Sequence, residues 1–230
     1  MNPSFDKMTH SKFYELGGIL WDIIVLSILW LIFSLPVVTS GASSAALYYA
    51  VYKRFRKRSG NPTGDFFHSF KMNLKQGLIL SIIIVAFGSL VFLNIQMARL
   101  KVGNIALPDW YLPFAILLIV PFCILYSFMY PYLARFSNDT KHVIMISCTL
   151  ASMNLPKSFL LLILGAASMA VMILFPPCVL FVPFLAAYLR MRIVEPVFEK
   201  ALRTQQNREN KAAEEDEDDN EEIEGDLEDA

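Results

Sequence analysis

The chain has 230 residues, 55% of them hydrophobic and 18% charged, and its mean hydropathy is +0.46. A soluble domain cannot bury this much apolar surface, so the composition excludes an ordinary soluble protein and indicates an integral membrane protein. The formal net charge of −1 is unevenly distributed: residues 1–208 hold 19 Lys and Arg against 8 Asp and Glu, and 13 acidic residues follow between Glu209 and Asp229. A basic membrane body is therefore followed by an acidic C-terminal segment.

A short polar segment, residues 1–15, precedes an apolar run in which Asp22 is the only formal charge between Leu16 and Tyr52. About 20 apolar residues are enough to span a bilayer as a helix. The run is too long for the apolar region of a signal peptide and contains a carboxylate, so we expect a retained anchor. We predict a polar segment over residues 1–15, a transmembrane domain over residues 16–200 and a tail over residues 201–230.

The sequence PVVTSG, from Pro36 to Gly41, interrupts this run, because proline disrupts a helix interior and glycine can adopt a positive φ. We therefore predict a long helix over residues 16–35 and a short one over residues 42–55. The short helix either crosses the membrane or forms a re-entrant or interfacial segment. A juxtamembrane basic cluster marks its cytoplasmic end: Lys53, Arg54, Arg56, Lys57 and Arg58.

Four apolar residues that follow a turn at residues 60–62 recur at helical spacing: Phe66, Phe67, Phe70 and Leu74. This stripe predicts an amphipathic helix that lies at the lipid headgroups. Uncharged runs over residues 77–98 and 110–134 then predict two further spans, joined by a short loop.

In the polar connector over residues 135–157, Asn138 or Asp139 can cap a helix that runs to about Asn154. We expect this connector at the cytoplasmic face. The uncharged residues 158–189 are interrupted by the pair Pro176-Pro177 and end at Arg190 and Arg192. The last hairpin therefore repeats the plan of the first: a long helix, a proline break, a short helix and a basic stop.

These patterns predict an all-α, polytopic transmembrane helix bundle of five or six spans with short interfacial helices. We favour six spans, arranged as three helical hairpins. Six spans place 18 Lys and Arg inside and 2 outside, whereas five spans place 16 inside and 4 outside. With six spans, the N-terminus and the C-terminus are both cytoplasmic.

An ionisable residue inside a span is a candidate functional group, which makes Asp22 the first candidate. Its carboxylate either pairs with a basic side chain in a structural role or lies on a path for a solute or proton. We expect five polar residues of the spans to form interhelical hydrogen bonds: Ser27, Ser81, Ser89, Asn94 and Gln96. Further candidates for substrate contact at a broken helix, or for helix packing, are Pro36, Thr39, Gly41, Ser43, Tyr48, Tyr49, Asn73 and Asn94.

The sequence lacks HExxH, GxSxG and Walker motifs, and its three cysteines lack CxxC spacing. We therefore expect no enzymatic activity, no cofactor and no metal site. Membrane topology accounts for the basic cluster, so nucleic-acid binding is not expected. The acidic tail is too polar to bury a core and is predicted to be disordered. It is either a solvated tail or a segment that binds residues 53–58 or a basic partner.

Five stretches of sequence carry a family resemblance: WDIIVLSILWLIFSLPVVTSGASSAALYYAVYKRF, FFHSFKMNLKQG, YPYLARFSNDTKHVI, ASMNLPKSFLLLILG and FLAAYLRMRIVEPVFEK. Together they resemble the YesL-type family of uncharacterised bacterial integral membrane proteins, and PVVTSGASSAALYY is the most specific part. Ser27 departs from the family pattern, which more often has asparagine there. The resemblance implies a multi-pass protein of the bacterial plasma membrane.

The genes of this family often neighbour those of carbohydrate ABC transporters, their regulators and glycoside hydrolases. The resemblance therefore implies an accessory or assembly subunit of a carbohydrate ABC transporter, whose partners are the lipid bilayer and the transporter subunits. The alternative is an autonomous small-solute transporter or channel, acting alone or as a homo-oligomer. No catalytic or ligand-binding residue comes with the resemblance.

Overall fold

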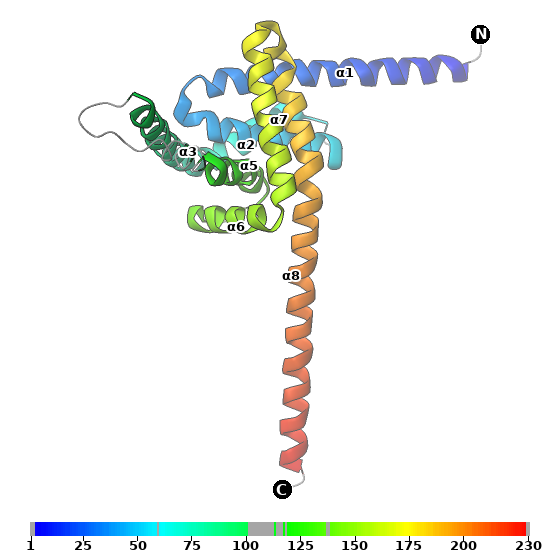
Figure 1. Ribbon diagram of the computed structural model, residues 1–230. Coiled ribbons are helices and arrows are strands. Elements are labelled where there is room, and N and C mark those ends of the chain that lie inside the picture. The colour runs from blue at the N-terminus through cyan, green and yellow to red at the C-terminus, as the bar shows by residue number, and fades with distance from the viewer. Residues whose placement is uncertain are drawn as a thin grey trace. The chain divides into compact units, whose positions relative to one another are not determined.

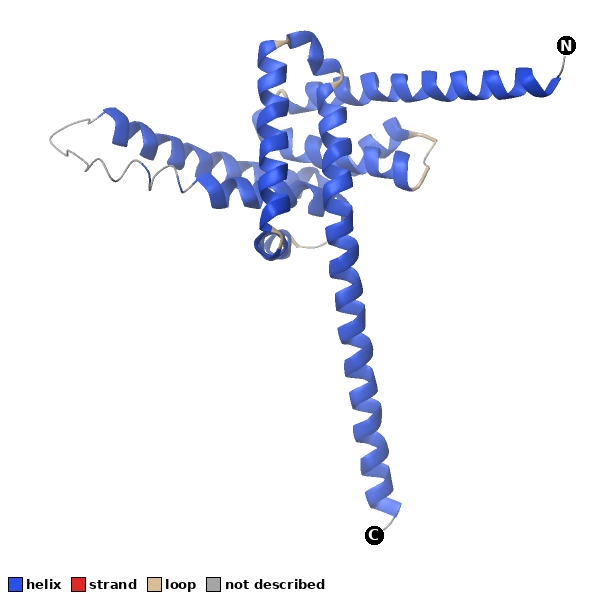
Figure 2. Cartoon of the chain, turned by 45° about the vertical axis from the view of Figure 1, so that its right-hand side comes forward, coloured by secondary structure: helices blue, strands red, loops and turns tan. Residues whose placement is uncertain are grey.

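The computed structural model of the chain describes residues 3–58, 60–100, 119–136 and 139–228, together with residues 113 and 117. Throughout this part of the chain the regular elements are helices joined by short loops, as Figure 2 shows. The all-helical fold class expected from the sequence is confirmed. Residues 99 and 100 of the loop expected between residues 98 and 110 belong to α3, and the rest of that loop lies outside the described residues.

The elements follow the chain in this order (Figure 1): α1 Pro3–Ser34, η1 Val37–Thr39, α2 Ser40–Arg56, α3 Pro62–Leu100, α5 Ile119–Arg135, α6 Thr140–Met153, α7 Leu155–Leu174, η2 Pro176–Leu180 and α8 Val182–Glu228. The short 3-10 turns η1 and η2 fall at the two predicted proline breaks. Pro36 has extended backbone angles, φ −72° and ψ 116°, so the chain leaves α1 before it enters α2.

Two helices differ from the expected boundaries. α1 begins at Pro3, well before the apolar run. α3 is continuous from Pro62 to Leu100, so the predicted amphipathic helix and the span after it form a single helix of 39 residues. The chain between residues 63 and 100 contains no proline, and nothing in it forces the helix to end.

The stripe at the start of α3, which we expected at the lipid headgroups, is divided between the interior and the surface: Phe67 and Leu74 are each 37% exposed. Phe66 is fully buried and Phe70 is 9% exposed. Their rings pack against Phe33 of α1, with centroids 6.1 Å and 4.7 Å away. Burial of aromatic rings between helices stabilises their packing, so Phe66 and Phe70 hold α3 to α1.

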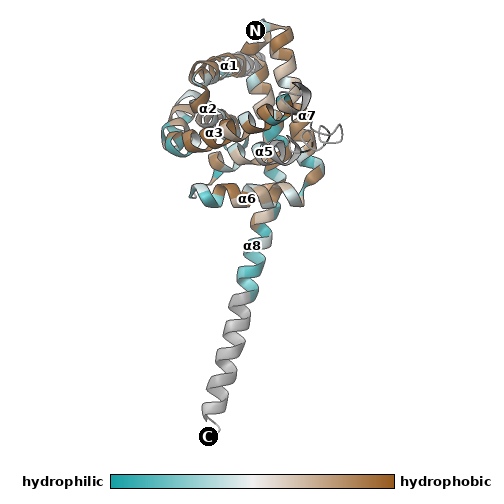
Figure 3. Cartoon of the chain, turned by 60° about the vertical axis from the view of Figure 1, so that its left-hand side comes forward, coloured by the Kyte–Doolittle hydropathy of each residue, from teal (hydrophilic) through white to brown (hydrophobic). Residues whose placement is uncertain are grey.

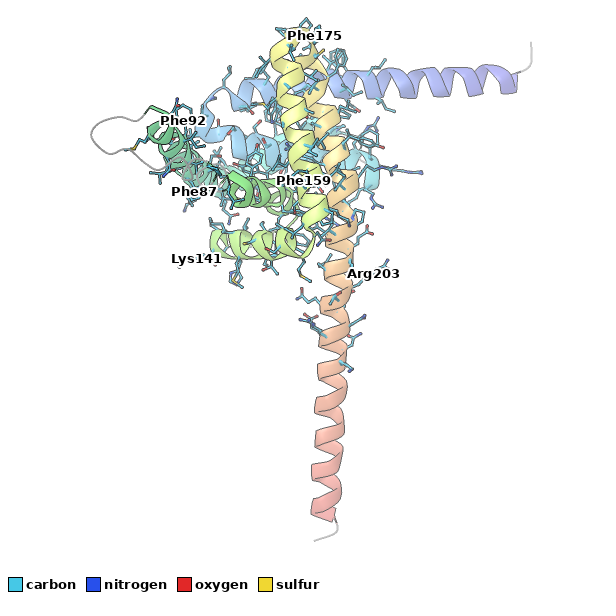
Figure 4. The ribbon with its side chains drawn as sticks, in the orientation of Figure 1. Phe87, Phe92, Lys141, Phe159, Phe175 and Arg203 are labelled. Atoms are coloured by element: carbon cyan, nitrogen blue, oxygen red, sulfur yellow. The ribbon has the colours of Figure 1, made fainter. Side chains whose placement is uncertain are left out.

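Three described segments are long and apolar enough to cross a membrane: Gly17–Ser34 of α1, Pro62–Met97 of α3 and Leu155–Leu174 of α7. Within the protein their most apolar windows are only 11%, 17% and 11% buried. Hydrophobic colour follows the described parts of α1 and α3 in Figure 3. Figure 4 shows side chains of these segments at the outside of the helices, among them the exposed Phe87, Phe92 and Phe159; the exposed Phe175 directly follows α7. Such large apolar faces are expected of helices that contact lipid.

In contrast to these exposed helices, α2 is largely buried and lies at the centre of the helix packing. It packs against α1, α3 and α5, and its small residues Ala42, Ala45, Ala46 and Ala50 are fully buried. Small side chains let helix backbones approach closely, which is how membrane helices pack without a hydrophobic driving force. A helix covered in this way is a core element rather than one that lies on a lipid surface.

The chain divides into two units, residues 1–192 and residues 193–230. α8 passes from the first unit into the second and continues to Glu228, where we expected a disordered tail from residue 201. The tail contains eight Glu and four Ala between residues 201 and 230, and both residue types favour helical backbone even without an apolar face to bury. The disorder of this segment in solution stays a prediction. All contacts described below lie within the first unit.

Candidate functional site

The start of α2 is joined to two other helices by a buried polar contact. The backbone N–H of Gly41 donates a hydrogen bond to the Ser81 hydroxyl of α3 at 3.0 Å, and that hydroxyl lies 3.4 Å from the Tyr130 hydroxyl of α5. The first N–H groups of a helix have no partner within the helix, and Ser81 satisfies one of them. We call these three residues the glycine junction.

Polar side chains around the proline break form hydrogen bonds that join α1 to the start of α2. Thr39 donates a hydrogen bond to the backbone carbonyl of Phe33 at 2.8 Å, and Ser43 donates one to the carbonyl of Trp30 at 3.0 Å. In return, the Trp30 indole N–H donates to the Ser44 hydroxyl at 3.2 Å. The Thr39 bond satisfies a carbonyl in the last turn of α1, where carbonyls lack helical partners.

Two ion pairs tie the basic end of α2 to its neighbours. Arg54 binds Asp22 of α1 at 2.8 Å, and Lys53 binds Asp65 of α3 at 2.9 Å. The side chains of Asp22 and Arg54 are only 14% and 24% exposed, so their attraction is weakly screened by solvent. The Lys53 ammonium also lies 4.9 Å from the centre of the Tyr49 ring, a cation–π distance.

A cavity of about 380 Å³ lies beside this assembly. Five helices line it. Trp30 of α1, Tyr48 of α2, Tyr126 of α5 and Arg190 of α8 supply the polar tips, and α7 supplies a largely apolar wall between Leu161 and Met172. Tyr130, a member of the glycine junction, also lines it. This is the size and lining of a small-molecule site: mostly apolar, with a few polar groups that can orient a ligand.

The candidates named from the sequence are only partly brought together. Gly41 lies in the glycine junction, Thr39 and Ser43 lie at the break beside it, and Tyr48 lines the cavity. The others lie elsewhere. The exposed Pro36 begins the break, Asn73 donates a hydrogen bond to Ser69 within α3 at 3.1 Å, and Asn94 lies partly buried farther along α3.

Within the basic cluster, Arg56, Lys57 and Arg58 are exposed, unlike the partly buried Lys53 and Arg54. The expected basic loop is therefore divided: its first two members hold helices together and its last three face outward.

Sequence reasoning did not single out the aromatic residues that line the cavity from α1 and α5. Trp30, Tyr126 and Tyr130 were indistinguishable from other aromatic residues of apolar helices, and only the packing of distant helices places them together. One local signal was available: Tyr126 and Tyr130 are spaced four residues apart, and their rings pack edge to face with centroids 5.2 Å apart.

Residues 23–95 match the model of the family DUF624, described as a protein of unknown function. The DUF624 segment covers the C-terminal part of α1 from residue 23, all of η1 and α2, and most of α3. It thus includes Gly41 and Ser81 of the glycine junction, whereas Tyr130 and Arg190 lie beyond it. YesL-type proteins fall within DUF624, so the resemblance seen in the sequence is confirmed. No curated protein and no solved structure matches the chain.

Proposed function

We propose that this protein is an accessory or assembly subunit of a carbohydrate ABC transporter in the bacterial plasma membrane. The apolar helices and the DUF624 match support a membrane protein of an uncharacterised family. The link to carbohydrate uptake is implied by the YesL-type resemblance. In this role the chain supports other subunits and carries no solute itself.

The observation that carries this proposal is that the described carboxylates of α1 and α3 form ion pairs between helices. In the described parts of α1, from Gly17 onward, and of α3, the two carboxylates are Asp22 and Asp65, and both pair with the basic end of α2. A proton- or cation-coupled carrier needs an ionisable group that can change its partner during transport. Carboxylates that hold helices together favour a static scaffold.

For topology, we propose three helical hairpins with six crossings and cytoplasmic termini. The packed position of α2 between α1, α3 and α5 supports treating it as a full member of the bundle. The proline breaks at η1 and η2 would then form external turns, and the connector that contains α6 would lie inside. The exposed Lys141 of α6, labelled in Figure 4, fits a cytoplasmic face.

The alternative, an autonomous small-solute transporter or channel, is favoured by one observation: the cavity between five helices. Solute sites in transporters lie between helices near the membrane midplane and often beside broken helices. Purified protein reconstituted in liposomes tests this alternative directly. Uptake of a sugar or ion by the wild type, lost in an Asp22→Asn variant, would support transport and would contradict the accessory role.

The accessory role is tested by crosslinking cells that carry the tagged full-length chain, purifying it in mild detergent and identifying co-purified proteins by mass spectrometry. Cells with the untagged chain provide the control. We expect enrichment of ABC permease subunits or of a solute-binding protein. Recovery of the chain alone, as a defined homo-oligomer, would contradict the proposal.

A further inference from the structure

We propose that the cavity beside Arg190 binds a small amphipathic carboxylate. Such a molecule has one carboxylate group, which pairs with the guanidinium, and a short apolar body, which lies along α7. This inference goes beyond the proposed function, because binding of the molecule requires neither transport nor a transporter partner. It rests on the depth and charge of Arg190 and on the lining of the cavity.

Arg190 lies at the depth of the middle of a candidate span. A Cβ atom on Gly165 of α7 would lie 3.2 Å from a terminal nitrogen of Arg190, so the guanidinium lies close to the α7 backbone. Gly165 is the eleventh of the 20 residues of α7, which is itself a candidate span. Arg190 is therefore deeper than a basic residue at the end of a span, whose charged group stays in water. An ionisable side chain at this depth is a candidate functional group.

The charge of Arg190 has no counter-ion in the described part of the chain. Its side chain is half-buried and lines the cavity. Its guanidinium forms no hydrogen bond or ion pair with the residues that the structure describes, in contrast to Arg54, which binds Asp22. A cation without a partner is costly at low dielectric, so a bound anion would stabilise it. A ligand that enters the cavity can supply this anion.

A carboxylate is the anion that best matches a single guanidinium. Its two oxygens accept the two parallel hydrogen bonds that the planar fork of Arg190 can donate. A carboxylate also carries one negative charge, which the guanidinium neutralises. A phosphate monoester carries about 1.5 to 2 negative charges at neutral pH and would leave part of this charge uncompensated in an apolar cavity. The phosphate of a bilayer lipid lies at the membrane surface, far from this depth.

The lining beside Arg190 is mostly apolar and includes several small residues. Three alanines of α7 and α8 leave space between these two helices: Ala166, Ala186 and Ala187. Along α7 the lining continues from Gly165 to Met172, a rise of about 10 Å at 1.5 Å per residue. We call this part of the cavity the apolar trough. An apolar body of similar length fits the trough and needs no polar partner there.

Two other ligand classes fit this lining less well. A small inorganic anion such as chloride would pair with Arg190 but would leave the apolar trough without a partner. A neutral saccharide needs many hydrogen-bonding groups, whereas the described lining offers mainly the hydroxyls of Ser44, Ser168 and the tyrosines. Ser168 already donates its hydroxyl to the Leu164 carbonyl at 2.6 Å. One cation beside an apolar trough favours an amphipathic anion.

Trp30, which lines the cavity, provides the readout. In full-length protein that carries Trp21→Phe and Trp110→Phe, Trp30 is the remaining tryptophan, and its fluorescence in neutral detergent reports ligand binding. The probes are octanoate, octanol and acetate, each titrated separately. Octanol has the apolar body without the charge, and acetate has the charge without the body. We expect saturable binding of octanoate, at least about tenfold tighter than of octanol, and no saturation by acetate.

The variant Arg190→Gln should weaken octanoate binding by about 10- to 100-fold, because it removes a charge-assisted pair, and should leave octanol binding unchanged. This difference separates loss of the cation from damage to the cavity. Arg192→Gln, a matched loss of charge at an exposed position of the same helix, should bind octanoate as the wild type does. Ala186→Leu keeps Arg190 but fills the apolar trough and should abolish binding of both probes. Unchanged elution and thermal melting of each variant without ligand would show that it is folded.

Four results would overturn the proposal: equal octanoate binding by Arg190→Gln and the wild type, octanol binding as tight as that of octanoate, saturation of the Trp30 signal by acetate, or its saturation by maltose. The second would identify an uncharged apolar pocket, the third a free-anion site and the fourth a sugar site. Because these titrations use purified protein, their outcome is independent of whether transporter subunits co-purify from cells.

Discussion

The backbone N–H of Gly41 donates its hydrogen bond to the hydroxyl of Ser81, which is 40 residues away in the chain and 3.0 Å away in the fold. This contact joins the first turn of α2 to the middle of α3. Ser81 is 1% exposed, so the bond is made where water cannot replace it. The Ser81 hydroxyl thereby joins the start of α2, directly after the proline break, to α3.

Replacing Ser81 with alanine should therefore destabilise the protein by about 1 to 2 kcal/mol, because the buried N–H of Gly41 loses its acceptor. Ser27→Ala is a matched control: the Ser27 side chain is fully buried, and its hydroxyl has no hydrogen-bond partner within the described residues. Thermal unfolding in detergent should show a lower melting temperature for Ser81→Ala and little change for Ser27→Ala. Equal losses in the two variants would contradict a specific role for the glycine junction.

Gly77 of α3 should not tolerate even a methyl group. A Cβ atom there would lie 2.8 Å from the backbone N and Cα of Ala42, and backbone atoms of a packed helix cannot move aside cheaply. We expect Gly77→Ala to cost about 1 to 3 kcal/mol of stability. Gly17→Ala, at a helical glycine with open space around it, should be neutral or stabilising by up to about 1 kcal/mol. Thermal melting of the two variants side by side measures this difference, and a stable Gly77→Ala would refute the close α2–α3 approach.

Asp22 and Arg54 should show strong energetic coupling. Each of Asp22→Asn and Arg54→Gln removes this ion pair from a largely buried site, which should cost about 1 to 3 kcal/mol. The double variant should lose less than the sum of the two, because the energy of the pair is lost only once. The exposed Lys57→Gln, also in the basic cluster, should change stability by less than about 0.5 kcal/mol. Additive losses in the double-mutant cycle would show that the pair contributes nothing as a pair.

Thiol labelling should distinguish the two sides of the membrane. Cys148, an exposed free cysteine of α6, should react with an impermeant maleimide only in permeabilised cells, whereas Cys178 in η2 should react in intact cells. Both tests are made in a Cys123→Ser background with the other cysteine also replaced by serine. Labelling of Cys148 in intact cells would invert the proposed orientation.

The side of the membrane on which the N-terminus lies distinguishes six crossings from five. In a chain whose three native cysteines are replaced by serine, Ser4→Cys should be labelled only after permeabilisation if there are six spans. Labelling of the same variant in intact cells would indicate five. The two topologies agree on the sides of α6 and η2, so this measurement adds information that Cys148 and Cys178 cannot provide.

The sequence alone predicted the helical class, both proline breaks and a helix within the polar connector, because these depend on local chemistry. The N-cap of that helix is Asp139, but its side chain makes no capping hydrogen bond. Proline lacks an N–H, apolar runs must avoid water, and neither fact needs a partner elsewhere in the chain. The helix boundaries around Pro36 and Pro176 were accordingly close to those observed. The resemblance to YesL-type proteins was also readable from sequence, since it resides in residue order.

Tertiary structure decided which residues meet. Nothing local distinguishes Ser81, which bonds Gly41, from Ser27, whose hydroxyl is buried without a bond in the described chain. Asp22 was recognisable as a charge in a span, but its pairing with Arg54 depends on how α1 folds back along α2. The cavity beside Arg190 is the extreme case, because five helices must pack before it exists. Composition and periodicity fix where helices form, whereas interhelical contacts depend on the shapes of distant faces.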